Sequence, residues 1–128
     1  MRRLVFSLGL LFLLMLSLAS AFDPQRLVGE WEGQWKTPRV GDAIHMTIKK
    51  VEGTRVEGSM YIRGRLKYHN RDISFVGAID GMVFTANTPT LPGEPPIRWT
   101  LQVNDEATEM TGTGAGTAVA DVNIGKKR

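Results

Sequence analysis

The chain has 128 residues and a formal net charge of +3, with 16 Lys and Arg, 13 Asp and Glu, and no cysteine. About 100 to 200 residues make one domain, so this length excludes a multidomain enzyme. Without cysteine the chain forms neither a disulfide nor a thiolate metal site, and its stability must come from packing.

The first 21 residues differ from the rest in composition. Arg2 and Arg3 precede an almost unbroken apolar run, 4–18, and Ala19-Ser20-Ala21 supplies small residues at the spacing that a signal peptidase needs. This pattern is typical of a secretory signal peptide, and the run is shorter than the roughly 20 residues that span a bilayer. We therefore expect a signal peptide at 1–21, with an uncleaved anchor as the alternative.

That assignment leaves one exported domain at 22–128, which we expect to be periplasmic or extracellular and to have no stable membrane span after cleavage. Without Arg2 and Arg3 the balance is 14 basic against 13 acidic residues, a net charge of +1. Because no global positive field remains, we expect no nucleic-acid partner. The positive charge is instead local, concentrated at 61–71 and 126–128.

Beyond Ala21 the apolar residues recur mostly at every second position, which predicts half-buried strands. Turn residues separate these runs, and Asp80-Gly81 is the strongest hairpin signal among them. The segment 87–96 contains four of the six prolines and is predicted to be a loop. In chain order the expected strands cover 27–36, 43–51, 55–62, 73–79, 82–86, 97–103, 109–114 and 117–124.

About eight short antiparallel strands predict an all-β fold, either a small closed up-and-down barrel or a β-sandwich. We favour the barrel, because the connections are local and closure removes the exposed edges that promote aggregation. The interior of an eight-stranded barrel is just wide enough to be filled by side chains or to hold one small ligand.

Gly29-Glu30-Trp31, on the first expected strand, resembles the Gly-x-Trp signature of lipocalins and other calycins. The resemblance implies that Trp31 closes one end of the barrel and that a basic residue at the end of the chain packs over its ring. The candidates for this cation are Lys126, Lys127 and Arg128. A second resemblance, to small exported bacterial barrel domains of uncharacterised function, rests on turn glycines and core apolar residues: Val51-Glu52-Gly53, Val56-Glu57-Gly58, Phe75-Val76-Gly77 and Asp80-Gly81.

No catalytic or metal motif stands out. His45 and His69 lack partners at metal-ligand spacing and are predicted to be ordinary surface residues, while Ser59 and Ser74 lie outside any nucleophile motif. The glycines of 112–116 lack the third glycine of a dinucleotide loop and indicate crowded strands instead. We expect a non-enzymatic protein with no cofactor and no metal.

The best candidate site is the mouth of the barrel. There we expect a small apolar or amphipathic ligand to meet large interior side chains and a basic, aromatic-bearing loop. The alternative is an envelope structural or interaction module with a filled core, which would meet a protein partner through the basic loop. The candidate ligand-binding residues are Trp35, Met46, Met60, Phe75, Trp99, Arg63, Arg65 and Tyr68.

Overall fold

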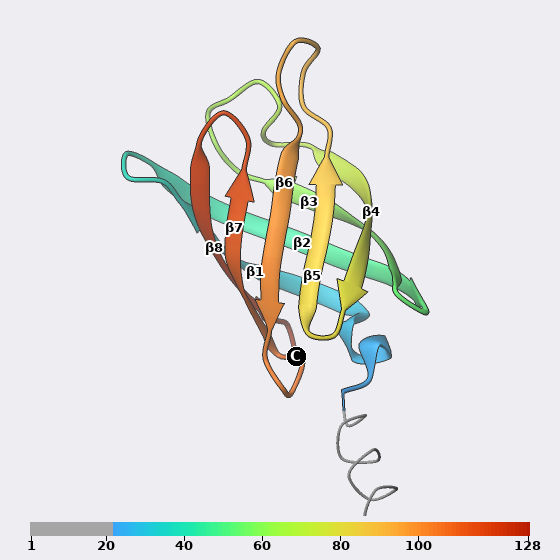
Figure 1. Cartoon of the computed structure of the whole chain (residues 1–128). Coiled ribbons are helices and arrows are strands. Elements are labelled where there is room, and N and C mark those ends of the chain that lie inside the picture. Colours follow the sequence, from blue (N-terminus) through green and yellow to red (C-terminus); the bar gives the residue numbers. More distant parts are fainter. Residues whose placement is uncertain (1–21) are drawn as a thin grey trace, which may run out of the picture.

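The computed structural model describes residues 22–128, drawn in colour in Figure 1. The signal peptide expected at 1–21 lies outside the described residues. Eight antiparallel strands form a closed barrel in which each strand pairs with its neighbours in sequence and the last pairs with the first. This topology confirms the up-and-down barrel and excludes the β-sandwich.

The strand boundaries lie close to those expected from the sequence. No boundary differs by more than two residues. Leu27, for example, ends a short 3₁₀ helix rather than opening a strand, and Lys126 belongs to the last strand. The elements are η1 (Pro24–Leu27), β1 (Gly29–Lys36), β2 (Gly41–Glu52), β3 (Arg55–Ile62), β4 (Asp72–Asp80), β5 (Val83–Thr88), β6 (Ile97–Val103), β7 (Glu109–Ala115) and β8 (Val119–Lys126).

Alternating hydrophobicity sets which face of each strand turns inward. In β6 the buried and exposed positions alternate without exception. At two hairpin turns the backbone needs a positive φ, and Gly53 and Gly81 supply it at 59° each. Within residues 22–128, no helix combines the length and apolarity needed to cross a membrane.

One half of the barrel is filled with large side chains. Met46 and Met60 are opposite each other on β2 and β3, and the rings of Phe75 and Phe84 meet edge to face at a centroid distance of 5.8 Å. All four side chains are buried. Edge-to-face contact adds to the stabilisation that burial of the two rings provides.

Trp31 lies at the end of this filled half and is fully buried. Its indole Nε1 donates a hydrogen bond of 2.9 Å to the carbonyl of Leu27 in η1, which lies against the end of the barrel. Lys126, paired with Trp31 in the β1–β8 register, donates from Nζ to the carbonyl of Arg26. We call this the closed end, and it is consistent with the calycin-like fold that the Gly-x-Trp resemblance implies.

Candidate functional site

The opposite end of the barrel is open. It carries the β3–β4, β5–β6 and β7–β8 connections, at the top of Figure 1, and the β1–β2 turn, at its upper left. Three of these connections surround a pocket of about 1060 Å³. Its lining includes Trp35, Ile62, Tyr68, His69, Ile97 and Trp99, with Arg39, Asp42, Arg65 and Leu66 among the residues supplied by the segments around it.

Trp35 comes from the end of β1 and is almost completely buried, with 9% of its surface exposed. Its indole Nε1 donates a hydrogen bond of 2.8 Å to the carbonyl of Arg63 at the start of the β3–β4 loop. The bond satisfies the polar group of the ring and ties the loop to β1. The rest of the ring is free to form an apolar wall of the pocket.

Trp99 comes from β6 and is also buried. Its Nε1 donates to Thr88 Oγ1 at 3.0 Å, so this indole also has its hydrogen bond within the protein. A Cβ atom added to Gly114 on β7 would lie 2.7 Å from the Trp99 ring. The glycine-rich sequence therefore makes room for a tryptophan against the barrel wall, as expected for crowded strands.

The β3–β4 loop, 63–71, is held by its own hydrogen bonds. Asn70 adopts a positive φ of 63°, its backbone N–H donates to the carbonyl of Ile62 at 2.7 Å, and its Nδ2 donates to the carbonyl of Gly64 at 2.7 Å. Asparagine tolerates this left-handed conformation better than most residues. The loop therefore folds back toward the barrel, which carries its middle residues to the pocket.

His69 is buried at the pocket, with 8% of its surface exposed, so the expectation of an ordinary surface histidine was wrong. Its ring lies 5.4 Å from that of Trp35 and 4.7 Å from that of Tyr68, and its Nδ1 accepts a hydrogen bond from the Leu66 N–H. A Cβ atom on Gly64 would lie 2.0 Å from Nδ1, so glycine is needed for the ring to pack here.

Burial lowers the pKa of His69, and the nearby carboxylate of Asp42 only partly opposes this effect. Burial also raises the pKa of Tyr68, and Glu94 from the β5–β6 loop adds to the increase. Both rings therefore favour their neutral forms. The inner part of the pocket is apolar and aromatic.

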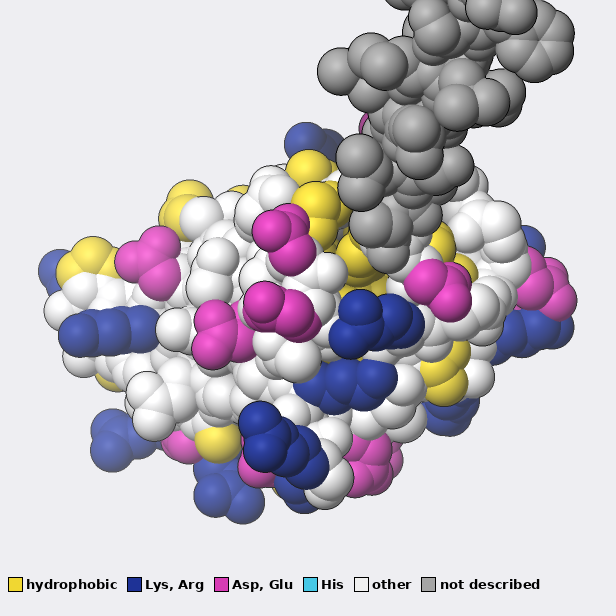
Figure 2. Space-filling model, turned by 90° about the horizontal axis from the view of Figure 1, so that it is seen from below, with side chains coloured by type: hydrophobic (Ala, Val, Ile, Leu, Met, Phe, Trp, Pro, Cys, Tyr) yellow, Lys and Arg dark blue, Asp and Glu magenta, His cyan; other side chains and the backbone are white. Residues whose placement is uncertain are grey.

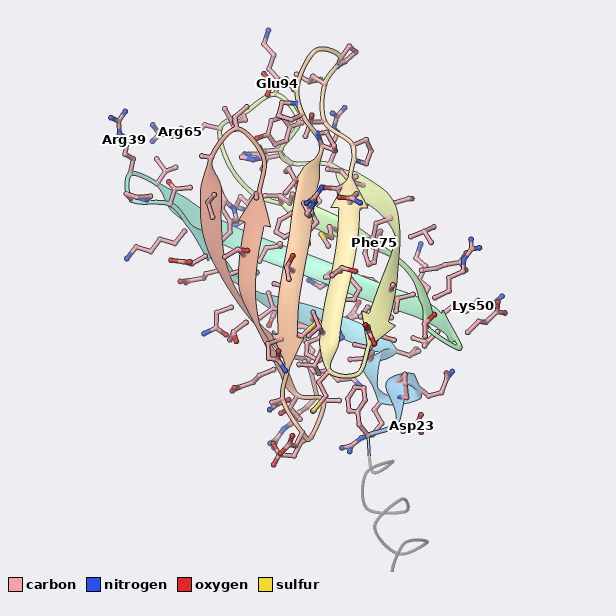
Figure 3. All side chains as sticks on the ribbon, viewed as in Figure 1. Asp23, Arg39, Lys50, Arg65, Phe75 and Glu94 are labelled. Atoms are coloured by element: carbon pink, nitrogen blue, oxygen red, sulfur yellow. The ribbon has the colours of Figure 1, made fainter. Side chains whose placement is uncertain are left out.

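Charged side chains belong to the rim. Figure 3 shows Arg39 and Arg65 pointing outward at the same corner of the open end, and residues 39 and 65 both border the pocket. Arg98 lies instead at a separate, smaller pocket of about 290 Å³. The arrangement is an apolar cavity with cations at its mouth.

The structure brings half of the sequence-predicted site residues to this pocket: Trp35, Arg65, Tyr68 and Trp99. Met46, Met60 and Phe75 lie in the filled half of the barrel and do not line the pocket. Arg63 is exposed, and its contribution is the backbone carbonyl that accepts from Trp35.

Sequence reasoning missed several lining residues. Ile62 and Ile97 stand at the strand ends nearest the open-end loops, and alternation was a sufficient signal for both. His69 gave no such signal, because its burial depends on how the β3–β4 loop folds back. Arg39 gave none either, because only the closed topology places the β1–β2 turn beside that loop.

In the part of the chain from 22 to 128, no three His, Cys, Asp or Glu side chains are grouped so as to hold a metal ion. Comparisons of the chain with protein-family models, curated protein sequences and solved structures gave no match. Function must therefore be argued from the geometry of the pocket.

Proposed function

We propose that this protein is an exported, non-enzymatic barrel module that binds a small amphipathic ligand, with the ligand's apolar part in the pocket and its polar end at the mouth. The observation that carries the proposal is the pocket of about 1060 Å³ at the open end. Pockets for small molecules typically measure about 300 to 1,000 Å³.

The lining supports an apolar occupant. Trp35 and Trp99 each use their indole N–H within the protein, which leaves their ring surfaces as apolar contacts. Tyr68 and His69 favour their neutral forms. An apolar chain entering this space would displace water without removing a hydrogen-bond partner from either indole.

The rim supports a polar, preferably anionic, end group. Arg39 and Arg65 border the pocket at its outer edge, and each presents a planar guanidinium whose geometry matches a carboxylate. Asp42, which also borders the pocket, disfavours an anion close to β2. We therefore place the ligand's anionic group on the side of the two arginines.

The test is a tryptophan fluorescence titration with laurate and with dodecanol, which share a chain length but differ in charge. The proposal expects saturable binding of both, with laurate bound more tightly because of the rim arginines. Native mass spectrometry of the exported protein would detect a ligand carried from the cell.

Two tryptophan variants test whether the probes bind inside the pocket. Ala120 is half-buried on β8 and lines the pocket, so Ala120→Trp fills the cavity and is expected to abolish binding. Val76 is 54% exposed on β4, so Val76→Trp adds the same side chain outside the barrel and is expected to bind like the unmodified protein. Equal binding by both variants, or no binding of either probe by the unmodified protein, would overturn the proposal.

The filled-core interaction module remains the alternative. The filled half around Met46, Met60 and Phe75 fits it, but the open-end pocket does not. Retained partner recovery after Arg63→Glu, Arg65→Glu and Arg71→Glu in a pull-down would count against recognition through the β3–β4 loop.

A further inference from the structure

Beyond ligand binding, we propose that the open-end rim docks onto an anionic lipid surface, with two loop tips entering the interface between headgroups and acyl chains. The two tips are residues 39–40 in the β1–β2 turn and 65–67 in the β3–β4 loop, which we call the rim tips. The docking does not require an occupied pocket.

Apolar side chains are exposed at the rim tips. Val40 is 53% exposed and Leu66 is 52% exposed, and both residues border the pocket mouth. A third exposed apolar residue, Val119, lies at the same end, where β8 begins. Among residues 22–128, these are three of the five large apolar side chains that the barrel leaves exposed.

Each rim tip also carries positive charge. Arg39 precedes Val40, and Leu66 lies between Arg65 and Lys67. Neither connecting segment, 37–40 or 63–71, contains an acidic residue. A cation next to an exposed apolar side chain is the combination that holds a protein segment at an anionic membrane interface, where the cation meets the headgroup and the apolar group enters below it.

The closed end differs. Figure 2, viewed toward that end, shows acidic and basic side chains intermingled over the visible surface. Glu32 pairs with Lys127 at 3.5 Å, and the Lys50–Glu52 and Arg55–Glu57 pairs are at the β2–β3 hairpin. Acidic side chains lie among the cations there and pair with Lys50, Arg55 and Lys127, so an anionic surface would attract the open end first.

The form of the rim favours a lipid surface over a protein partner. Its exposed apolar side chains stand on separate connections, and Val40 and Leu66 are at the mouth of a pocket. A fluid bilayer accepts separate side chains without needing a complementary shape, whereas a stable protein interface needs close packing over a contiguous area.

The experiment is flotation of the protein with vesicles of phosphatidylglycerol or of phosphatidylcholine. We expect binding to phosphatidylglycerol that weakens at high salt, and little binding to phosphatidylcholine. Arg39→Glu with Arg65→Glu is expected to reduce the partition onto phosphatidylglycerol vesicles about tenfold or more. The matched control is Lys49→Glu with Lys50→Glu, which makes the same change in net charge on β2 and is expected to retain binding.

A second measurement reports insertion at one position. In Leu66→Trp, brominated acyl chains in phosphatidylglycerol vesicles are expected to quench the added fluorescence, whereas in Val76→Trp they are not. Residues 1–21 are the same in every variant, so differences in flotation or quenching between variants come from the substituted positions. Ala120→Trp is expected to float like the unmodified protein, which separates this proposal from ligand binding.

Three outcomes would overturn the proposal: no flotation with either vesicle, equal loss of binding in the rim and control double variants, or no quenching at position 66. Capture of a soluble protein that requires Arg39 and Arg65, without vesicle binding, would also overturn it and assign the rim to a protein partner.

Discussion

Trp31 and Trp35 lie four residues apart on β1, point to the same face and are both hydrogen-bonded to a backbone carbonyl outside the strands. Their surroundings differ. Trp31 packs beneath η1 in the filled half and has no exposed surface, whereas Trp35 faces a pocket of about 1060 Å³. The comparison teaches that one strand provides both a buried plug at the closed end and a wall of the open-end pocket. The element that lies beyond each end of the strand determines which of the two roles a tryptophan has.

The largest expected effect comes from removing each ring in turn. Trp31→Ala should reduce the free energy of unfolding by about 3 to 5 kcal/mol, because it empties a fully packed site. Trp35→Ala should cost less, because part of that ring borders the pocket instead of packed side chains, but should weaken laurate binding more. Urea denaturation and ligand titration of both variants measure the two effects, and equal stability losses would break the distinction between the two ends.

The next effect concerns the β3–β4 loop, whose His69 ring packs 5.4 Å from that of Trp35. Gly64→Ala should lower the free energy of unfolding by about 1 to 3 kcal/mol, because the added Cβ atom forces His69 out of its position. Gly116→Ala is a control at the same end, since its Cβ atom would lie 3.4 Å from its nearest neighbour, Ile97. If Gly116→Ala is equally destabilising, the loss is not specific to the His69 contact.

A smaller effect is expected at the closed end. Lys126→Met keeps the apolar stem but removes the hydrogen bond to the carbonyl of Arg26, and should cost about 0.5 to 1.5 kcal/mol of unfolding free energy. Lys127→Met removes only an exposed pairing with Glu32, worth about 0 to 1 kcal/mol. Chemical denaturation compares them, and a larger loss in Lys127→Met would contradict the assigned role of Lys126.

The smallest expected effect is a dependence on pH. Burial lowers the pKa of His69 below 6.5, so the unfolded chain takes up a proton at a higher pH than the folded protein does. Stability from this residue is therefore complete above pH 6.5 and falls as the pH drops from there toward the lowered pKa. Thermal melts across that window should show a weaker pH dependence in His69→Gln, and an unchanged slope would contradict the burial effect.

Sequence alternation predicted the strands, and the local connections between them favoured the barrel over the sandwich. Trp31, Trp35, Trp99 and their strand partners follow a period of two, and Asp80-Gly81 marks a turn that the structure contains. The alternating pattern does not show which end of the barrel is open, because Trp31 and Trp35 occupy equivalent positions in that pattern within β1. It depends on η1, which covers Trp31 through Leu27, and such a short element has no strong periodic signal.

The rest of the site depends on contacts between segments far apart in the sequence. His69 reaches the pocket because Asn70 turns the backbone left-handed, and Met46, Met60 and Phe75 are inward-facing but lie too far from the mouth to line it. The odd or even position of a residue along a strand predicts whether its side chain points into the barrel. It does not predict how far from the mouth of the barrel that side chain lies. That is why only part of the predicted ligand-binding set surrounds the pocket.

The β1–β8 pairing has a consequence for how the chain folds. Seven of the eight pairings join strands that are consecutive in the sequence, and each can form as a local hairpin. The eighth brings Trp31 against Lys126 across most of the described chain and carries the largest loop-closure entropy of the eight. We therefore expect the pairing of β1 with β8 to limit the folding rate. Trp31 lies on this pairing, so burial of its ring stabilises the barrel once the two strands have met.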